Sequence, residues 1–161
     1  MANREASCSC GQLRVTVTGE PTRVSVCHCL ACQRRTGSAF GYQARFVRSG
    51  ATVSGRSTEW TRDSDDGEAT YTQHFCPDCG ATVYYVSDED PDNIAVPAGG
   101  FADPSFYPPQ RSVWESRKHA WVILPDDVIH DDEPPADGAL TAPAPPRPRR
   151  RPDRSPARTA S

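Results

Sequence analysis

Seven cysteines, gathered in three short groups, constrain this chain more than any other feature of its sequence. The groups are Cys8 with Cys10, Cys27 with Cys29 and Cys32, and Cys76 with Cys79. Cysteines so close in the chain are poorly placed to pair with one another as disulfides, because their Cβ vectors rarely meet the required geometry. They are well placed to converge on one metal ion. The chain is therefore expected to fold around metal.

Two of the groups contribute one pair of cysteines each. Each pair is followed directly by a glycine, Gly11 or Gly80. A glycine lets the backbone turn tightly, so that N–H groups point at the sulfur atoms and reduce the charge of the thiolates. Two pairs supply the four thiolates of a tetrahedral structural zinc site. We predict that this site consists of Cys8, Cys10, Cys76 and Cys79.

The remaining three cysteines, Cys27, Cys29 and Cys32, lie within six residues. Their fourth position is open unless a histidine, a carboxylate or a water fills it, and three protein ligands with one exchangeable ligand are typical of catalytic zinc. His28 and His74 are candidates for the fourth ligand, and an ordinary hydrogen-bonded role is the alternative for each. If the segment is extended, the side chain of His28 points away from the metal ion that Cys27 and Cys29 would bind.

Segments between the cysteines have the patterns of β-strands. Leu13, Val15 and Val17 alternate with polar residues, which is the period of a half-buried strand. Other segments are rich in aromatic and β-branched residues. Strands are predicted over residues 12–18, 24–26, 39–46, 69–75 and 82–86, with a short helix over residues 31–36. The expected domain is mainly β and spans residues 1–130, and its three tryptophans are expected in the core.

The composition changes near residue 130. Residues 131–161 hold eight of the sixteen prolines and no aromatic residue. Such a segment buries too little apolar surface to offset the entropy of ordering, so a disordered Pro/Arg-rich tail is predicted. Six arginines in it could contact nucleic acid or an acidic partner, and a solvated tail is the plainer interpretation.

Bulk properties exclude several classes of protein. The net charge of −3 gives the whole chain no strong attraction to nucleic acid or to an anionic membrane. No apolar run approaches the roughly 18 residues of a membrane span, and the N-terminal residues lack the apolar core of a secretion signal. We therefore expect a cytoplasmic protein without a membrane partner. Reduced cysteines in that compartment indicate metal or redox chemistry rather than disulfides.

Four stretches together resemble one known family. They are CSCGQLRVTVTGEP, CHCLACQRRTGSAF, FCPDCGATVYY, and VPAGGFADPSF followed by RSVWESRKHAWV. In this order, from about Cys8 to Leu124, they resemble the glutathione-dependent formaldehyde-activating (GFA) family, which includes the centromere protein V domain. The resemblance implies a β-tent of small antiparallel sheets built around zinc. It also implies one structural zinc at the four-cysteine site and a second zinc at the three-cysteine site, which meets glutathione.

The resemblance further implies an enzyme of the carbon–sulfur lyase type. Its substrates would be an aldehyde like formaldehyde and a small thiol, with glutathione as cosubstrate and Cys27, Cys29 and Cys32 as the catalytic ligands. Arg34 and Arg35 are candidates to hold a glutathione carboxylate, because arginine forms paired hydrogen bonds with carboxylates. The plainer interpretation of both is a solvated face beside an anionic cluster. Thr36 and Gly37 follow in a tight turn with free donors, and we predict that they also contact glutathione.

Two other functions fit the same sequence features. One is a zinc-stabilised binding module without catalysis, which would contact nucleic acid or a partner protein only through the arginines of the tail. The other is a sensor of metal or of redox state, because thiolates of low pKa are readily oxidised. The open three-cysteine site favours the enzyme.

Overall fold

The computed structural model describes residues 3–65 and 67–131, and within them the protein is mainly β. The strands are β1 (Asn3–Ser7), β2 (Arg14–Thr18), β3 (Arg23–Cys27), β4 (Gly41–Val47), β5 (Ala51–Ser54), β6 (Thr58–Asp63), β7 (Thr70–Phe75), β8 (Thr82–Ser87), β9 (Asn93–Pro97), β10 (Arg111–Val113) and β11 (Ile129–Asp131). The helices are α1 (Leu30–Thr36) and the short 3-10 helices η1 (Arg48–Gly50), η2 (Ala98–Phe101) and η3 (Glu115–Arg117).

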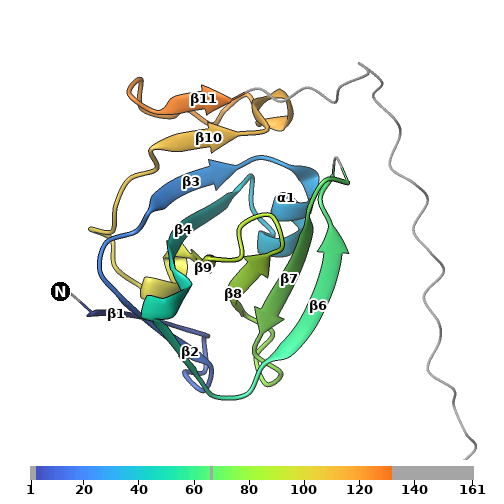
Figure 1. Ribbon diagram of the computed structural model, residues 1–161. Coiled ribbons are helices and arrows are strands. Elements are labelled where there is room, and N and C mark those ends of the chain that lie inside the picture. Colours follow the sequence, from blue (N-terminus) through green and yellow to red (C-terminus); the bar gives the residue numbers. More distant parts are fainter. Residues whose placement is uncertain (1–2, 66, 132–161) are drawn as a thin grey trace, which may run out of the picture.

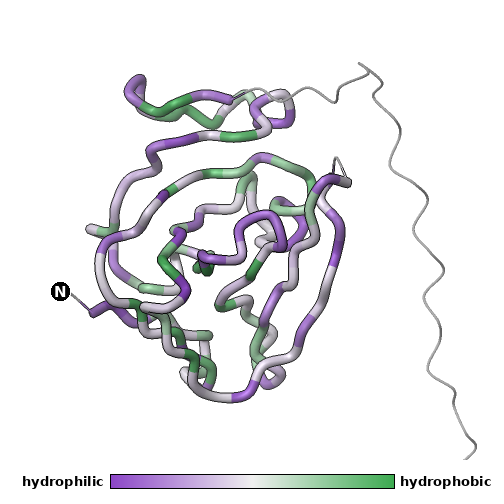
Figure 2. Tube along the Cα trace, in the orientation of Figure 1, coloured by the Kyte–Doolittle hydropathy of each residue, from purple (hydrophilic) through white to green (hydrophobic). Residues whose placement is uncertain are grey.

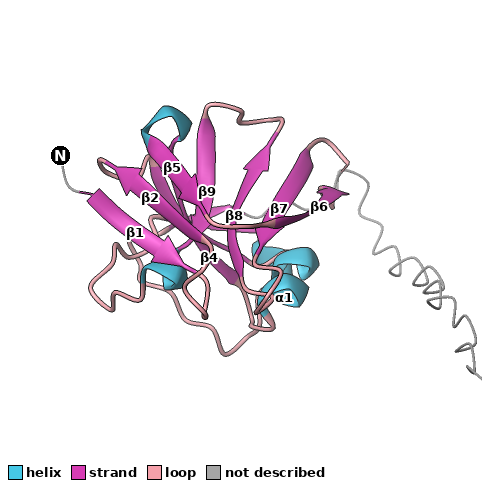
Figure 3. Ribbon diagram, turned by 90° about the horizontal axis from the view of Figure 1, so that it is seen from below, coloured by secondary structure: helices cyan, strands magenta, loops and turns pink. Residues whose placement is uncertain are grey.

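These strands form two sheets. The small sheet has the order β1-β2-β5, and the large sheet has the order β11-β10-β3-β4-β9-β8-β7-β6. Strand β10 pairs in parallel with β3 and with β11, whereas the other pairings are antiparallel. The large sheet curves around a common interior, with α1 between β3 and β7 (Figure 1). The small sheet lies on the side away from α1 (Figure 3).

The hydrophobic core lies where the small sheet packs on the large one. Leu13, Val15 and Val17 are fully buried, as the alternation of β2 predicts. They pack in one cluster with residues of β4 and β9, including Phe46 and Val96. Figure 2 shows hydrophobic stretches gathered around β2, and more hydrophilic stretches along β6. The core therefore occupies one end of the protein and leaves the other end of the large sheet to polar side chains.

The prediction of a mainly β fold made of antiparallel sheets is confirmed, and so is the single short α-helix. Strands β2, β3, β4, β7 and β8 and helix α1 lie where the patterns predicted them. Strands β1, β5, β6, β9, β10 and β11 were not predicted, because they are short or carry polar residues on their exposed faces. Pairing with neighbouring strands stabilises them, rather than their own sequence patterns.

The expectation that the tryptophans lie in the core is wrong. Trp60 is 57% exposed and Trp121 is 71% exposed. Trp114 is half-buried and has a positive φ of 60°. Trp60 and Trp114 instead line a cavity, which is described below.

Strand β11 ends at Asp131, close to the predicted domain boundary. The remainder of the predicted tail, residues 132–161, lies outside the described residues. Contacts of its arginines with nucleic acid therefore stay a prediction. No helix in residues 3–65 and 67–131 is long and apolar enough to cross a membrane.

Candidate metal centre and the adjoining cavity

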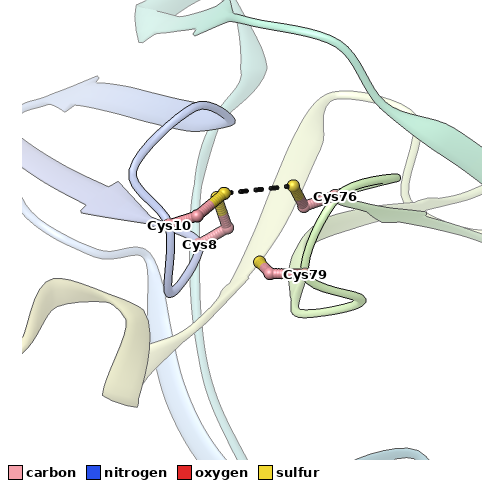
Figure 4. A group of neighbouring side chains, drawn as sticks. All are labelled: Cys8, Cys10, Cys76 and Cys79. Atoms are coloured by element: carbon pink, nitrogen blue, oxygen red, sulfur yellow. Dashed lines mark hydrogen bonds between the residues drawn. The ribbon is translucent and has the colours of Figure 1, made fainter.

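Two loops bring together the four cysteines that the sequence paired. Cys8 and Cys10 lie in the loop between β1 and β2, and Cys76 and Cys79 lie in the loop between β7 and β8. The two loops come from different sheets and face each other, with all four side chains directed toward a common point (Figure 4). All four Sγ atoms lie within 4.8 Å of one another.

The spacing of these sulfur atoms fits a tetrahedral metal ion. Zinc–sulfur bonds of about 2.3 Å place neighbouring sulfur atoms about 3.8 Å apart. The Sγ atoms of Cys8 and Cys10 are 3.5 Å apart, and those of Cys10 and Cys76 are 3.6 Å apart. The donor set and its spacing therefore fit zinc.

Both loops have the same backbone design. In the first, the N–H of Cys8 donates to Leu13 O and the N–H of Gly11 donates to Cys8 O, each at 2.9 Å. In the second, the N–H of Cys76 donates to Ala81 O and the N–H of Gly80 donates to Cys76 O, also at 2.9 Å. Gly11 and Gly80 have φ values of 77° and 75°, in the region that favours glycine. The glycines thus make the turns, as predicted.

Hydrogen bonds and mutual repulsion set the charges of the four thiols. Burial alone would raise the pKa of Cys76, but hydrogen bonds from the Gln12 side chain and from the backbone lower that pKa to about 6. The Gln12 Nε2 donor lies 3.1 Å from Cys76 Sγ. A hydrogen bond from the backbone of Gln12 favours the thiolate of Cys10, but the neighbouring thiols hold the pKa of Cys10 up at about 12. Complete ionisation of the cluster therefore requires a cation.

The other three cysteines meet where β3 ends and α1 begins. Cys27 is the last residue of β3, Cys29 is the N-cap of α1, and Cys32 lies in its first turn. Their Sγ atoms lie within 4.8 Å of one another. The backbone N–H of Cys32 donates to Cys29 Sγ at 3.3 Å. Across the sheet, Cys27 pairs with Gly41, where an added Cβ would lie 3.3 Å from Cys32 Sγ.

The three thiols differ sharply in their proton affinity. Hydrogen bonds from Cys27 and Cys29, together with the positive charge of Arg35, lower the pKa of Cys32 to about 3. The same hydrogen bonds, together with burial, raise the pKa of Cys27. One thiolate is thus stable in this cluster without metal. Three thiolates are stable only around a cation, which is the donor chemistry of a metal site.

No fourth His, Cys, Asp or Glu ligand atom joins this cluster within residues 3–65 and 67–131. His28, a predicted candidate, is fully buried, and its Nε2 lies 3.2 Å from Ser112 Oγ on β10. His74 stacks on Tyr84 with the ring centroids 4.1 Å apart. Neither histidine therefore belongs to the three-cysteine cluster, and both have the ordinary hydrogen-bonded or packed role.

A cavity of about 780 Å³ adjoins the three-cysteine cluster. Its wall includes Cys27, Cys29 and Cys32, together with side chains from β3, β4, β6, β7, β8 and α1. Five arginines line it, namely Arg23, Arg34, Arg35, Arg45 and Arg62. The acidic lining residues are Glu59, Asp65 and Glu89, and the large aromatic ones are Trp60, Tyr71, Phe75, Tyr85 and Trp114. The cavity is therefore suited to an anionic ligand with a polar backbone.

The structure brings some of the predicted glutathione contacts to this cavity. Arg34 is exposed at its wall, and the guanidinium of Arg35 lies 5.7 Å from the ring centroid of Tyr85. Thr36 and Gly37 are not among the lining residues. The hydroxyl of Thr36 donates to Cys32 O at 2.9 Å, and Gly37 ends α1. Contact of Thr36 and Gly37 with a ligand stays a prediction.

Several other polar residues of the wall were not predicted from the sequence, and four of them are important below. Arg23 and Arg45 lie on β3 and β4, and Gln43 and Gln73 lie on β4 and β7. Arg23, Gln43 and Arg45 alternate with apolar residues and therefore have the pattern of a solvent-facing side. Gln73 lies between the polar residues Thr72 and His74. Strand alternation alone could not distinguish solvent from a polar cavity.

Comparison with known proteins found a matching family model and similar solved structures. The family model described as "Glutathione-dependent formaldehyde-activating enzyme" (GFA) matches residues 3–117. A crystal structure of a Rhodobacter sphaeroides protein, determined by structural genomics, is similar with a TM-score of 0.49 and 20% sequence identity. That match covers 65% of this chain and 91% of the other. A search among curated proteins found no significant match.

Proposed function

Because the chain belongs to the family of glutathione-dependent formaldehyde-activating enzymes, we propose that it catalyses the addition of a small thiol to an aldehyde and the reverse cleavage. Membership of the family supports a glutathione-related formaldehyde-activating or related function. The finer assignment, a zinc-dependent carbon–sulfur lyase that acts on the adduct of glutathione with formaldehyde, is the proposal.

One observation carries this proposal. Three thiols that converge within 4.8 Å lie on the wall of a large, arginine-rich cavity, and no fourth protein ligand joins them in the described chain. A purely structural site is closed by four protein ligands, as in the neighbouring four-cysteine cluster. A site of three ligands that opens on a cavity is suited to an exchangeable ligand. Zinc, when bound by these thiolates, would favour the ionised form of a thiol that enters the fourth position.

The protein's own residues would bind the thiol and keep its sulfur ionised. The guanidinium of Arg35 lies beside Cys32. Its positive charge there offsets the negative charge of the crowded thiolate cluster. Arg34 is exposed at the wall and has no ion pair within residues 3–65 and 67–131, so it is available for a carboxylate. The aromatic lining excludes part of the water and strengthens these charged interactions.

The reaction itself needs no redox cofactor. The sulfur lone pair of the ionised thiol forms a bond to the aldehyde carbon while the π electrons of the C=O bond move to oxygen. That oxygen takes a proton from water, and the product is a hydroxymethyl thioether. In the reverse direction the carbon–sulfur bond breaks, and the thiol and the aldehyde are released.

The adduct also forms without a catalyst, so the test measures the rate of exchange rather than the amount of product. NMR exchange spectroscopy follows the interconversion of free glutathione and its hydroxymethyl adduct at catalytic amounts of zinc-loaded protein. We expect faster exchange with the wild-type protein and the spontaneous rate with Cys27, Cys29 and Cys32 all changed to Ser.

Arg14→Gln is the matched control for that experiment, because Arg14 lies on β2 in an ion pair with Glu5 and away from the cavity. This variant should keep the wild-type rate. A folded, zinc-replete wild-type protein that leaves the exchange at its spontaneous rate would refute the proposed function.

A further inference from the structure

One face of the β3–β4 pair presents only polar groups to the cavity. In the antiparallel register, Arg23 lies opposite Arg45, Ser25 opposite Gln43, and Cys27 opposite Gly41. Alternate residues of a strand point to the same side of a sheet, so these residues share one face. The lining of the cavity includes five of the six, all except Gly41. The cysteine cluster and the two arginines therefore lie at opposite ends of one continuous surface.

The two arginines form an unusual cross-strand pair. Like charges directly opposite each other in a sheet destabilise it. Arg45 has an ion pair with Asp90, and 11% of its side chain is exposed. Arg23 has no ion pair within residues 3–65 and 67–131, and its buried Nε has no hydrogen-bond partner. The Nε of Arg45 is also buried without a partner. This end of the cavity thus holds excess positive charge and unused donors.

Two buried carboxamides line the same cavity. Gln43 is 5% exposed and Gln73 is 7% exposed, and the side-chain oxygen of each has no hydrogen-bond partner. Buried polar groups in native proteins are almost always hydrogen-bonded, so two unpaired acceptors and two unpaired donors on residues that line one cavity call for an explanation. Unpaired buried groups lower the stability of the protein and are expected at functional sites, where a bound ligand can supply their hydrogen-bond partners.

We infer that Arg23, Arg45, Gln43 and Gln73 form a second subsite of the cavity, which binds a carboxylate remote from the sulfur of the thiol substrate. The guanidinium groups would hold the carboxylate, and the amide oxygens would accept from an ammonium or amide N–H group beside it. This inference rests on the proposed function, because it assigns the second end of the same substrate.

The spacing of the two ends sets the size of that substrate. Cys27 and Arg23 are four residues apart on one strand, so their Cα atoms are about 13 Å apart. In free cysteine the carboxylate is only three bonds from the sulfur. A tripeptide such as glutathione spans about 10 Å when extended, and an arginine side chain bridges the remainder. The subsite therefore selects peptide-sized thiols over single amino acids.

Other charges around the cavity leave this assignment intact. The carboxylate of Asp65 is held by Arg62 and Arg117, and Glu59 lies 3.6 Å from His74 Nδ1. Burial lowers the pKa of His74, so this histidine does not neutralise Glu59. Asp90 acts electrostatically on Arg23 but is the ion-pair partner of Arg45, so one carboxylate faces two guanidinium groups.

The test uses S-methylglutathione, which keeps the carboxylates of glutathione but cannot form a thiolate. It is titrated calorimetrically into full-length, zinc-loaded protein, with S-methylcysteine as the short probe. Arg23→Gln should weaken the binding of S-methylglutathione about tenfold or more, since a hydrogen-bonded ion pair is lost. The wild-type protein should bind S-methylcysteine more weakly than S-methylglutathione, and Arg23→Gln should not change the affinity for S-methylcysteine. The control Arg14→Gln should bind both probes as the wild type does.

A second readout separates a binding role from a merely structural one. Because Arg23 opposes Arg45 and lacks a partner, Arg23→Gln should leave the melting temperature of the ligand-free protein unchanged or raise it. Gln43→Met, which removes the amide with little change in volume, should also weaken S-methylglutathione binding. It gives an independent result if Arg23→Gln does not fold. Unchanged affinity in the folded variants would overturn the inference.

Failure of this inference and failure of the proposed function give different results. If binding of S-methylglutathione depends on Arg23 while the wild-type protein does not accelerate exchange of the formaldehyde adduct, the subsite stands and the reaction is wrong. If exchange is accelerated and Arg23→Gln leaves the affinity for S-methylglutathione unchanged, the reaction stands and the subsite is wrong.

Discussion

Glu115, on η3, is linked through Ser112 to His28 in the segment that carries the three-cysteine cluster. Its carboxylate accepts a hydrogen bond from Ser112 Oγ and pairs with Lys118 at 2.8 Å and with His130 at 2.9 Å. Ser112 in turn contacts the buried His28, which lies between Cys27 and Cys29. A single carboxylate thus joins β10, η3 and β11 and supports one side of the candidate site.

Glu115→Gln should therefore lower the stability of the protein at neutral pH. Burial would raise the pKa of Glu115, but hydrogen bonds from Lys118, Ser112 and His130 lower it from 4.5 to about 2. A depressed pKa means that the carboxylate stabilises the folded state above about pH 4.5, and that this stabilisation is lost as the pH falls toward 2.

Thermal unfolding of the two proteins at several pH values measures this difference. Acid also releases metal from thiolates, but that loss affects both proteins and largely cancels in the comparison. Glu5→Gln is the control, because Glu5 is half-exposed and its ion pair with Arg14 is worth little. A difference between Glu115→Gln and the wild type that stays constant down to pH 2 would contradict the role given to Glu115.

The β3–β4 pair shows how much of the candidate site the sequence can predict. Local spacing identifies Cys27, Cys29 and Cys32, because ligands two or three positions apart can meet without contacts from the rest of the fold. The function of Arg23 depends on Arg45, which lies opposite it only after the strands pair. Alternation predicts that a strand has two faces, but a polar face over a cavity has the same pattern as a polar face in solvent.

The loops at the strand ends give a prediction about folding. The four-cysteine site joins two loops whose cysteines, Cys10 and Cys76, are 66 positions apart. The free energy of zinc binding at such a site contributes directly to the stability of the fold, and it is on the order of 10 kcal/mol in small zinc domains. The three-cysteine cluster crosslinks only six residues. Cys79→Ser should therefore destabilise or unfold the domain, whereas Cys32→Ser should leave it folded.

Circular dichroism melting curves, with zinc content measured on the same samples, check this pair of variants. Each variant should also lose about one zinc ion per chain relative to the wild type. Equal melting temperatures would contradict the division of the seven thiols into one structural site and one open site.

The whole molecule is completed by contacts between segments far apart in the sequence. Strand β10 pairs in parallel with β3, and this pairing brings Val113 and Trp114 to the cavity wall. Such parallel, long-range pairing leaves little local pattern, which is why the sequence indicated the mainly β class but not β10 or β11. The domain boundary near residue 130 stays a prediction, and β11 ends at Asp131.

Two truncations test that boundary. A chain that ends at Asp131 should keep the melting temperature of the full chain within about 1–2 °C, because a tail without apolar anchors makes few stabilising contacts. A chain that ends at Val128 should melt lower, since it loses β11 together with the ion pairs of Asp131 and His130. If the first truncation melts as low as the second, the tail is part of the folded domain.

The central claim is that the three-cysteine cluster is open and takes the sulfur of a small thiol as its fourth ligand. Zinc itself gives no visible absorption, so the measurement uses protein loaded with Co²⁺, whose thiolate charge-transfer absorption grows with each bound thiolate. Glutathione should raise this absorption in the wild-type protein. S-methylglutathione should not raise it, and neither compound should change the spectrum of a protein in which Cys27, Cys29 and Cys32 are Ser. An unchanged spectrum of the wild-type protein at millimolar glutathione would contradict the account.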